Sequence, residues 1–120
     1  MVPHHSDVLA VHWATRATYS RLLRAGVKIY EWLPSVLHAK VLSVDGRLCA
    51  IGSYNLDRRS LLLNWELSVL VGDKATARTL DRNFDADLDR CIAIDRTNWA
   101  RRGLLPRLVE RFFYAFRRWL

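Results

Sequence analysis

The fold is decided by the stretch His38-Ala39-Lys40-Val41-Leu42-Ser43-Val44-Asp45, which is followed by Gly52-Ser53-Tyr54-Asn55. Residues 37–44 alternate as a β-strand does, and residues 47–52 return as a second strand. Asp45-Gly46 between them is a strong two-residue turn signal. The stretch therefore predicts a β-hairpin in which His38 and Lys40 share one face.

A third strand is predicted over residues 64–71. Its apolar side carries Trp65, Leu67, Val69 and Val71, and its opposite side carries Asn64, Glu66 and Ser68. Side chains at alternate positions of a strand share a face. We therefore expect Glu66 to lie on the polar side of a strand next to the hairpin.

These residue types suit the attack on a phosphodiester, which requires positioning and stabilisation of charge on the phosphate oxygens. Lys40 supplies a positive charge, while Ser53 and Asn55 supply neutral donors. His38 is the candidate nucleophile. A carboxylate on its second ring nitrogen would fix the tautomer, and Glu66 is the candidate for that role. Each residue taken singly is ordinary, but together they predict a catalytic site.

Two residues of the stretch are assigned to structure. Asp45 is explained by the turn that it forms with Gly46, and a salt bridge could add to its role. Gly52 permits a sharp bend and a close approach of the backbone to a ligand.

The pattern His-x-Lys, four residues, Asp, then Gly-Ser-x-Asn resembles the HKD signature of the phospholipase D superfamily. The flanking sequence is similar to bacterial cardiolipin synthases, and within them to the second, C-terminal HKD half. The segments that carry this likeness are Ser6-Asp7, Leu22 to Trp32, Gly52 to Ser60 and Leu63-Asn64-Trp65-Glu66.

The resemblance implies an α/β fold, with a mixed β-sheet flanked by helices, that forms one whole or partial lobe of the phospholipase D-like fold. It also implies a phosphatidyltransferase that uses two molecules of phosphatidylglycerol, releases glycerol and passes through a phosphohistidine at His38. Lys40, Ser53 and Asn55 would bind the phosphate, and Glu66 would support the histidine. No metal or other cofactor is implied.

Members of that family carry two HKD motifs whose histidines face each other, whereas this chain has one. A complete site would therefore need a homodimer or a separate N-terminal HKD half. Two alternatives stay open. One is a phospholipase D-like nuclease or phosphodiesterase, and the other is a catalytically silent fragment of a two-motif enzyme.

Composition limits the remaining possibilities. The 120 residues are 51% hydrophobic with five tryptophans, which predicts one folded domain with a modest core. The charge is +7, but the last twenty residues hold six arginines and one acid, so the rest is nearly balanced and no nucleic-acid partner is expected. Cys49 is expected in the core, and a disulfide with Cys91 is not expected. No apolar run approaches the roughly 18 residues that span a bilayer, and the N-terminus lacks a signal-peptide layout.

The remaining elements follow from periodicity and capping signals. A helix is expected from Ser6 to Gly26, a strand over 27–32, and a helix beginning at Gly72-Asp73. We expect an HKD half-domain at residues 1–103 and a basic amphipathic helix at 104–120. The apolar side of that helix carries Leu105, Leu108, Val109, Phe112, Phe116, Trp119 and Leu120.

This C-terminal helix has the composition of helices that lie in a membrane interface, with arginines on the other side. Packing of the same aromatic residues on the domain core is the alternative. The membrane interpretation predicts a peripheral protein on the cytoplasmic face of a bacterial inner membrane, with anionic phospholipid as its partner.

Overall fold

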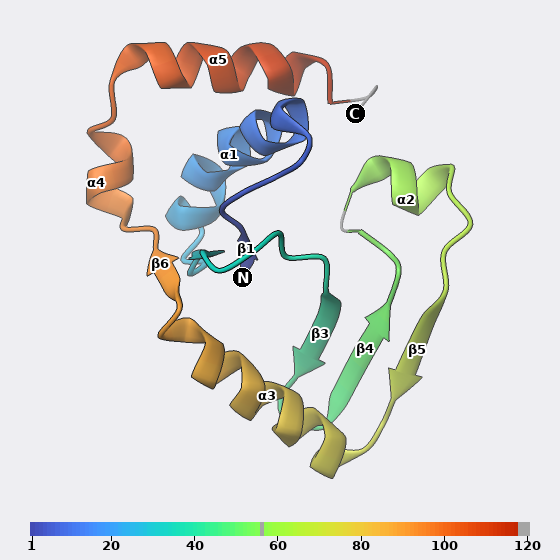
Figure 1. The fold of residues 1–120 in the computed structure, drawn as a ribbon. Coiled ribbons are helices and arrows are strands. Elements are labelled where there is room, and N and C mark those ends of the chain that lie inside the picture. The colour runs from blue at the N-terminus through green and yellow to red at the C-terminus, as the bar shows by residue number, and fades with distance from the viewer. Residues whose placement is uncertain (56, 118–120) are drawn as a thin grey trace. The chain divides into compact units, whose positions relative to one another are not determined.

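The computed structural model describes residues 1–55 and 57–117 and contains helices and two small sheets (Figure 1). The α/β class is confirmed. In chain order, the elements are β1 (Val2–Pro3), α1 (Leu9–Arg24), β2 (Tyr30–Trp32), β3 (Lys40–Val44), β4 (Leu48–Gly52), α2 (Arg58–Leu62), β5 (Ser68–Val71), α3 (Lys74–Leu88), β6 (Cys91–Ala93), α4 (Arg96–Ala100) and α5 (Leu104–Ala115).

The described strands form two three-stranded sheets where one mixed sheet was expected. They belong to two compact units: unit 1 comprises residues 1–37 and 90–120, and unit 2 comprises residues 38–89. In unit 1, β2 pairs parallel to β1 and antiparallel to β6. In unit 2, β4 pairs antiparallel to both β3 and β5.

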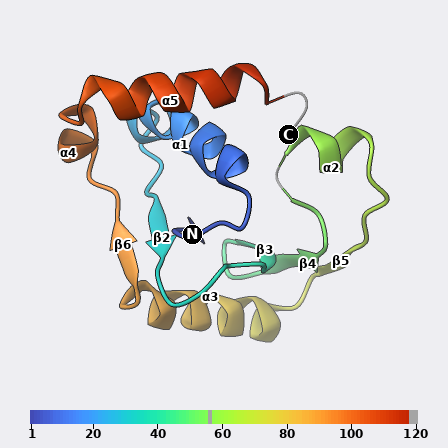
Figure 2. The ribbon, with the colours of Figure 1, turned by 45° about the horizontal axis from the view of Figure 1, so that its top comes forward.

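The core of unit 1 forms on the inner side of α1. Tyr19, Leu23, Ile29 and Trp99 form its buried cluster, and α5 packs along α1 (Figure 2). The first helix begins at Leu9 and not at Ser6, because the Ser6 hydroxyl accepts from the Val8 N–H and closes a turn before the helix. The helix ends as expected before Gly26, whose φ of 83° is the left-handed conformation that glycine adopts readily.

Unit 2 contains the hairpin, and α3 packs against β3 and β4. Asp45 and Gly46 have φ values of 53° and 58°, and the Arg47 N–H donates to the Val44 carbonyl across the turn. Cys49 is buried, as expected. The predicted start of α3 is confirmed, since the Asp73 carboxylate caps the helix by accepting from the Thr76 N–H at 2.8 Å.

Three local predictions about the strands are wrong. The strand before the turn begins at Lys40, so His38 precedes it, and the third strand begins at Ser68, so Glu66 precedes that one. The strand at residues 27–32 is limited to β2. Strand pairing explains why the strand before the turn begins at Lys40. Its partner β4 ends at Gly52, which is opposite Lys40, and the next residue, Ser53, donates its N–H to the Leu67 carbonyl on the β5 side.

Candidate active site

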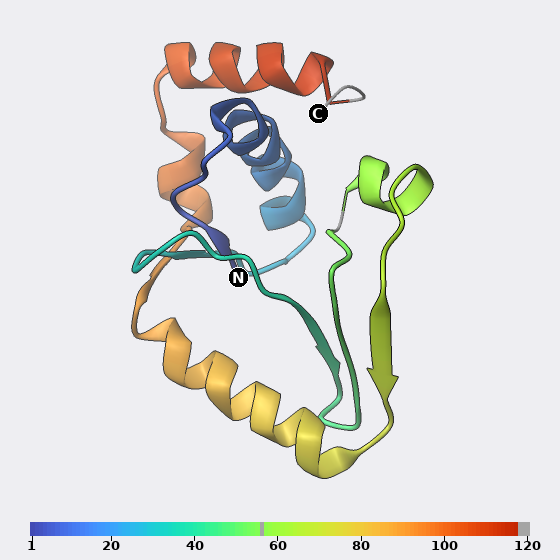
Figure 3. The same cartoon turned by 45° about the vertical axis from the view of Figure 1, so that its right-hand side comes forward.

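One end of the unit 2 sheet gathers the motif. Lys40 pairs with Gly52, and Gly52 pairs with Ser68, so three segments meet there. They are the residues entering β3, the residues leaving β4 and the residues entering β5. Figure 3 shows this end of the sheet, where the chain passes through α2 between β4 and β5. The register therefore places residues that are far apart in sequence around one edge.

Gly52 fixes the spacing of two strands at this edge. A Cβ atom on Gly52 would lie 2.7 Å from the Ser68 Cα and still closer to the Leu67 carbonyl oxygen. Its φ is not in the left-handed region. Gly52 thus allows a close approach to the backbone of the neighbouring strand. The sequence had suggested a sharp bend and a close approach to a ligand.

Ser53 holds Glu66 in place. The Ser53 hydroxyl donates to Glu66 Oε2 at 2.5 Å and accepts from the Leu67 N–H at 3.1 Å. The Asn64 amide donates to Glu66 Oε1 at 3.4 Å. The alternation placed Asn64 on the polar side, but no sequence signal indicated that its side chain would bind Glu66. The Glu66 carboxylate is oriented by these two neighbours.

The Lys40 side chain contacts the backbone of His38. Lys40 Nζ donates to the His38 carbonyl oxygen at 2.7 Å, and the His38 side chain is exposed. Among the residues that the structure describes, no hydrogen bond connects His38 to Glu66, and none involves the Asn55 side chain. The proposed support of His38 by Glu66 therefore stays a prediction, as does phosphate binding by Asn55.

The hydrogen bond from Ser53 is the main cause that lowers the pKa of Glu66 below its ordinary value of 4.5, and the positive charge of Lys40 adds to this effect. Glu66 is thus held as an acceptor. A group whose pKa is lowered by folding stabilises the fold above its unfolded pKa. That contribution is lost as the pH falls through the lower, folded pKa.

We expect the substitution Ser53→Ala to raise the pKa of Glu66 toward 4.5, because the donor that favours the carboxylate is removed. Carbon-detected NMR titration of the Glu66 carboxyl group measures this shift. Ser68→Ala is the matched control, since Ser68 begins the neighbouring strand. An unchanged pKa in Ser53→Ala, or an equal rise in both variants, would contradict this explanation.

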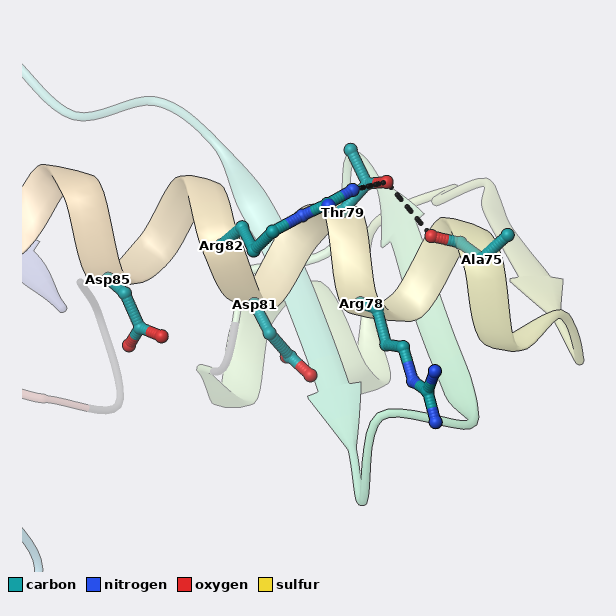
Figure 4. Close-up of a pocket in the computed structure, with 6 residues that line it drawn as sticks. All are labelled: Ala75, Arg78, Thr79, Asp81, Arg82 and Asp85. Carbon is teal, nitrogen blue, oxygen red and sulfur yellow. Dashed lines mark hydrogen bonds between the residues drawn. The ribbon is translucent and has the colours of Figure 1, made fainter.

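The other end of the hairpin carries a different set of side chains. A hollow on α3 is lined by Ala75, Arg78, Thr79, Asp81, Arg82 and Asp85 (Figure 4). A Cβ atom on Gly46 would lie 3.3 Å from Asp81 Oδ2, so the hollow adjoins the turn. Its two arginines are balanced by two aspartates, and it contains none of the predicted site residues.

Asp45 lies at this turn end, away from the pairing of Lys40 with Gly52. Among the side chains that the structure describes, no ion pair involves Asp45, and its positive φ supports the turn role that the sequence suggested. No group of three histidine, cysteine, aspartate or glutamate side chains suited to a metal ion occurs within the described residues.

Sequence reasoning missed a cluster of charges in unit 1. Glu31, 2% exposed, accepts from Arg16 at 2.8 Å and contacts His4 Nδ1 at 2.7 Å. Glu110, 4% exposed, accepts two hydrogen bonds from Arg102, at 2.5 and 3.0 Å. The available signals were an acid inside the apolar run at residues 27–32 and a single acid among the C-terminal arginines.

Comparison with known proteins covers the segments that carry the motif. The family model for the phospholipase D-like domain of cardiolipin synthase matches residues 1–88, which include every residue assigned to the site. The chain belongs to this cardiolipin synthase family. The family match confirms the resemblance drawn from the HKD signature.

Relatives in the cardiolipin synthase family extend the match over 97% of the chain. Cardiolipin synthase A of Erwinia tasmaniensis is 42% identical over 116 residues, and the proteins of that name from Yersinia pseudotuberculosis and Yersinia pestis are 40% identical. The chain spans about a quarter of the length of these relatives (24%). No solved structure matches it.

Proposed function

We propose that this chain is one HKD half of a phosphatidyltransferase of the cardiolipin synthase type. The observation that carries the proposal is the register of unit 2, which brings the segments of His38, Ser53 and Glu66 to one sheet edge. The name and the identity of the relatives support the choice of a lipid substrate over a nucleic acid.

The reaction would have two steps at phosphorus. A ring nitrogen of His38 forms a bond to the phosphorus of phosphatidylglycerol, and the bond from phosphorus to the glycerol oxygen breaks. The departing oxygen takes a proton from an acid, and glycerol leaves. A hydroxyl of a second phosphatidylglycerol then forms a bond to phosphorus and gives its proton to the base left by that acid. The bond from phosphorus to nitrogen breaks, which frees His38 and yields cardiolipin.

The residues near His38 have distinct roles in this proposal. Lys40 and Asn55 bind the phosphate oxygens, where negative charge must be stabilised. Glu66 supports the imidazolium, and Ser53 orients Glu66 through the 2.5 Å hydrogen bond. Direct binding of phosphate by Ser53, which the sequence suggested, stays a prediction, and the hydrogen bond to Glu66 adds a positioning role.

The acid would come from a second HKD half, in a homodimer or in a separate chain. Unit 2 supports this proposal because all three of its strands expose apolar side chains, and such surfaces are characteristic of interfaces. Those that are at least half exposed are Leu42, Val69 and Leu70 on the strands and Leu61, Leu62, Leu63, Trp65 and Leu67 in the segment between β4 and β5.

The test is to incubate the purified chain with phosphatidylglycerol in mixed micelles and to measure cardiolipin and glycerol. One sample contains the chain alone over a range of concentrations, and another adds a relative from which the matching quarter has been removed. We expect cardiolipin in at least one of them. Activity that rises with chain concentration indicates a homodimer, and folded protein without product in both samples contradicts the proposed function.

We also propose a peripheral location at the cytoplasmic face of a bacterial inner membrane, since the donor lipid resides in a bilayer. No helix among the described residues has the length and hydropathy that a membrane crossing requires.

A further inference from the structure

One side of α5 presents a continuous apolar surface to the solvent. Its residues follow helical spacing along α5 to its C-cap, and we call them the α5 ridge: Leu104, Leu105, Leu108, Phe112 and Phe116, whose exposed fractions are 74, 73, 62, 60 and 48%. Val109 lies at its margin and is partly buried. Arg118, Trp119 and Leu120, which the sequence added to this helix, lie outside the described residues.

The opposite side of α5 faces α1 and carries a charge. Glu110 is 4% exposed, accepts both hydrogen bonds from Arg102, and has Arg16 Nε 3.8 Å from its Oε1. Arg102 in turn lies over the ring of Trp99, at 3.1 Å from the ring centroid. Rotating α5 to bury the ridge would expose Glu110 and break these bonds. The ion pairs therefore fix the ridge toward the solvent.

The charge beside the ridge is positive. Arg101, Arg111 and Arg117 are exposed, and Arg107 is partly exposed. Glu110, the single acid between residues 101 and 117, is already neutralised by Arg102. A partner that fits this surface must offer apolar volume and negative charge together.

We propose that the α5 ridge docks into the interface of an anionic phospholipid bilayer, with the leucines and phenylalanines among the upper acyl chains and the arginines at the headgroups. The choice of a lipid partner rests on the proposed function, because the phosphatidyl donor is an anionic lipid. The helix lies parallel to the surface, since its twelve residues are too short to cross it.

The test is flotation of the full 120-residue chain with vesicles of phosphatidylglycerol and phosphatidylcholine, and with vesicles of phosphatidylcholine alone. Leu105→Asp and Leu108→Asp place a charge on the ridge. Leu9→Asp is the matched control, since Leu9 on α1 is 69% exposed and Leu105 is 73% exposed. Circular dichroism verifies that each variant is folded, and sedimentation velocity reports its oligomeric state.

We expect binding to the anionic vesicles that is at least tenfold weaker in both ridge variants and within about twofold of the parent in Leu9→Asp. Equal binding of parent and ridge variants overturns the proposal, as does equal binding to both vesicle types. Absence of vesicle binding by the parent overturns it too, and a ridge-dependent dimer in that case assigns the surface to a second copy. Binding is measured without turnover, so an inactive chain that binds vesicles contradicts only the proposed function.

Discussion

Replacing His38 with alanine abolishes cardiolipin formation in whichever sample assembles a complete site. We expect a loss of roughly 10⁴-fold or more, because removing a nucleophile eliminates the covalent step and leaves only binding and charge stabilisation. Lys40 and Ser53 stay in place, because neither contacts the imidazole ring. Lys40 donates to the His38 backbone carbonyl, and Ser53 contacts Glu66 and the Leu67 N–H.

The matched control is His5→Ala, because His5 is also exposed but lies in unit 1. Its activity should equal that of the parent. A second measurement identifies the intermediate: brief incubation with phosphatidylglycerol labelled at phosphorus, followed by quenching, should leave an acid-labile label on the parent and none on His38→Ala. Label or product that persists in His38→Ala would assign the nucleophile to another residue.

Replacing Glu110 with alanine destabilises unit 1 by about 3–5 kcal/mol, which is the range measured when one member of a buried ion pair is removed. Glu110 is buried, and its loss leaves Arg102 without the two hydrogen bonds that it donates. Arg16 keeps its hydrogen bond to Glu31. The effect should therefore be concentrated where α5 contacts α1.

Native-state hydrogen exchange of the α1 and α5 amides measures this loss within unit 1. Asp7→Ala is the matched control, since Asp7 is an exposed acid of the same unit and should change stability by less than about 0.5 kcal/mol. The double variant Glu110→Leu with Arg102→Met should recover part of the loss, because apolar replacement of a whole buried pair is often neutral. A loss in Glu110→Ala no larger than in Asp7→Ala would contradict the role given to the ion pair.

The sequence predicted best where a signal is local. The Asp45-Gly46 turn depends on two adjacent residues that tolerate positive φ, and the Asp73 cap depends on a bond to a residue three positions later. The HKD signature works in the same manner, because spacing along two paired strands already fixes which residues meet. That is why the hairpin and the family could be predicted from sequence.

The sequence predicted least where a neighbouring strand or helix determines the end of a strand or the burial of a side chain. His38 and Glu66 have the alternation of strand residues, but β3 pairs with β4 only from Lys40 onward, and β5 pairs with β4 only from Ser68 onward. Periodicity shows which residues could extend a strand and not where its neighbour stops. The burial of Glu110 could not be predicted for the same reason. As an acid among arginines it resembles a solvated residue, and it is buried because α1 packs against α5.

The α5 helix shows the limit of amphipathic patterns most clearly. Four residues of its predicted apolar stripe are exposed, namely Leu105, Leu108, Phe112 and Phe116. From the pattern alone, either side of the helix could have faced the core. The choice depends on Arg102, which lies two residues before α5, and on Arg16 of α1, which is distant in sequence. A helical wheel contains no information about such partners.

The pairing of β2 with β6 has a further consequence. Trp32 is opposite Cys91, and the Leu33 N–H donates to the Arg90 carbonyl at 3.3 Å, so the chain leaves unit 1 and re-enters it at neighbouring positions. Residues 38–89, which contain the whole HKD motif, are thus an insertion between two adjacent strand ends. A short turn could join those ends without removing any strand pairing of unit 1. The strand pairing of unit 1 therefore does not depend on the segment that holds the proposed site.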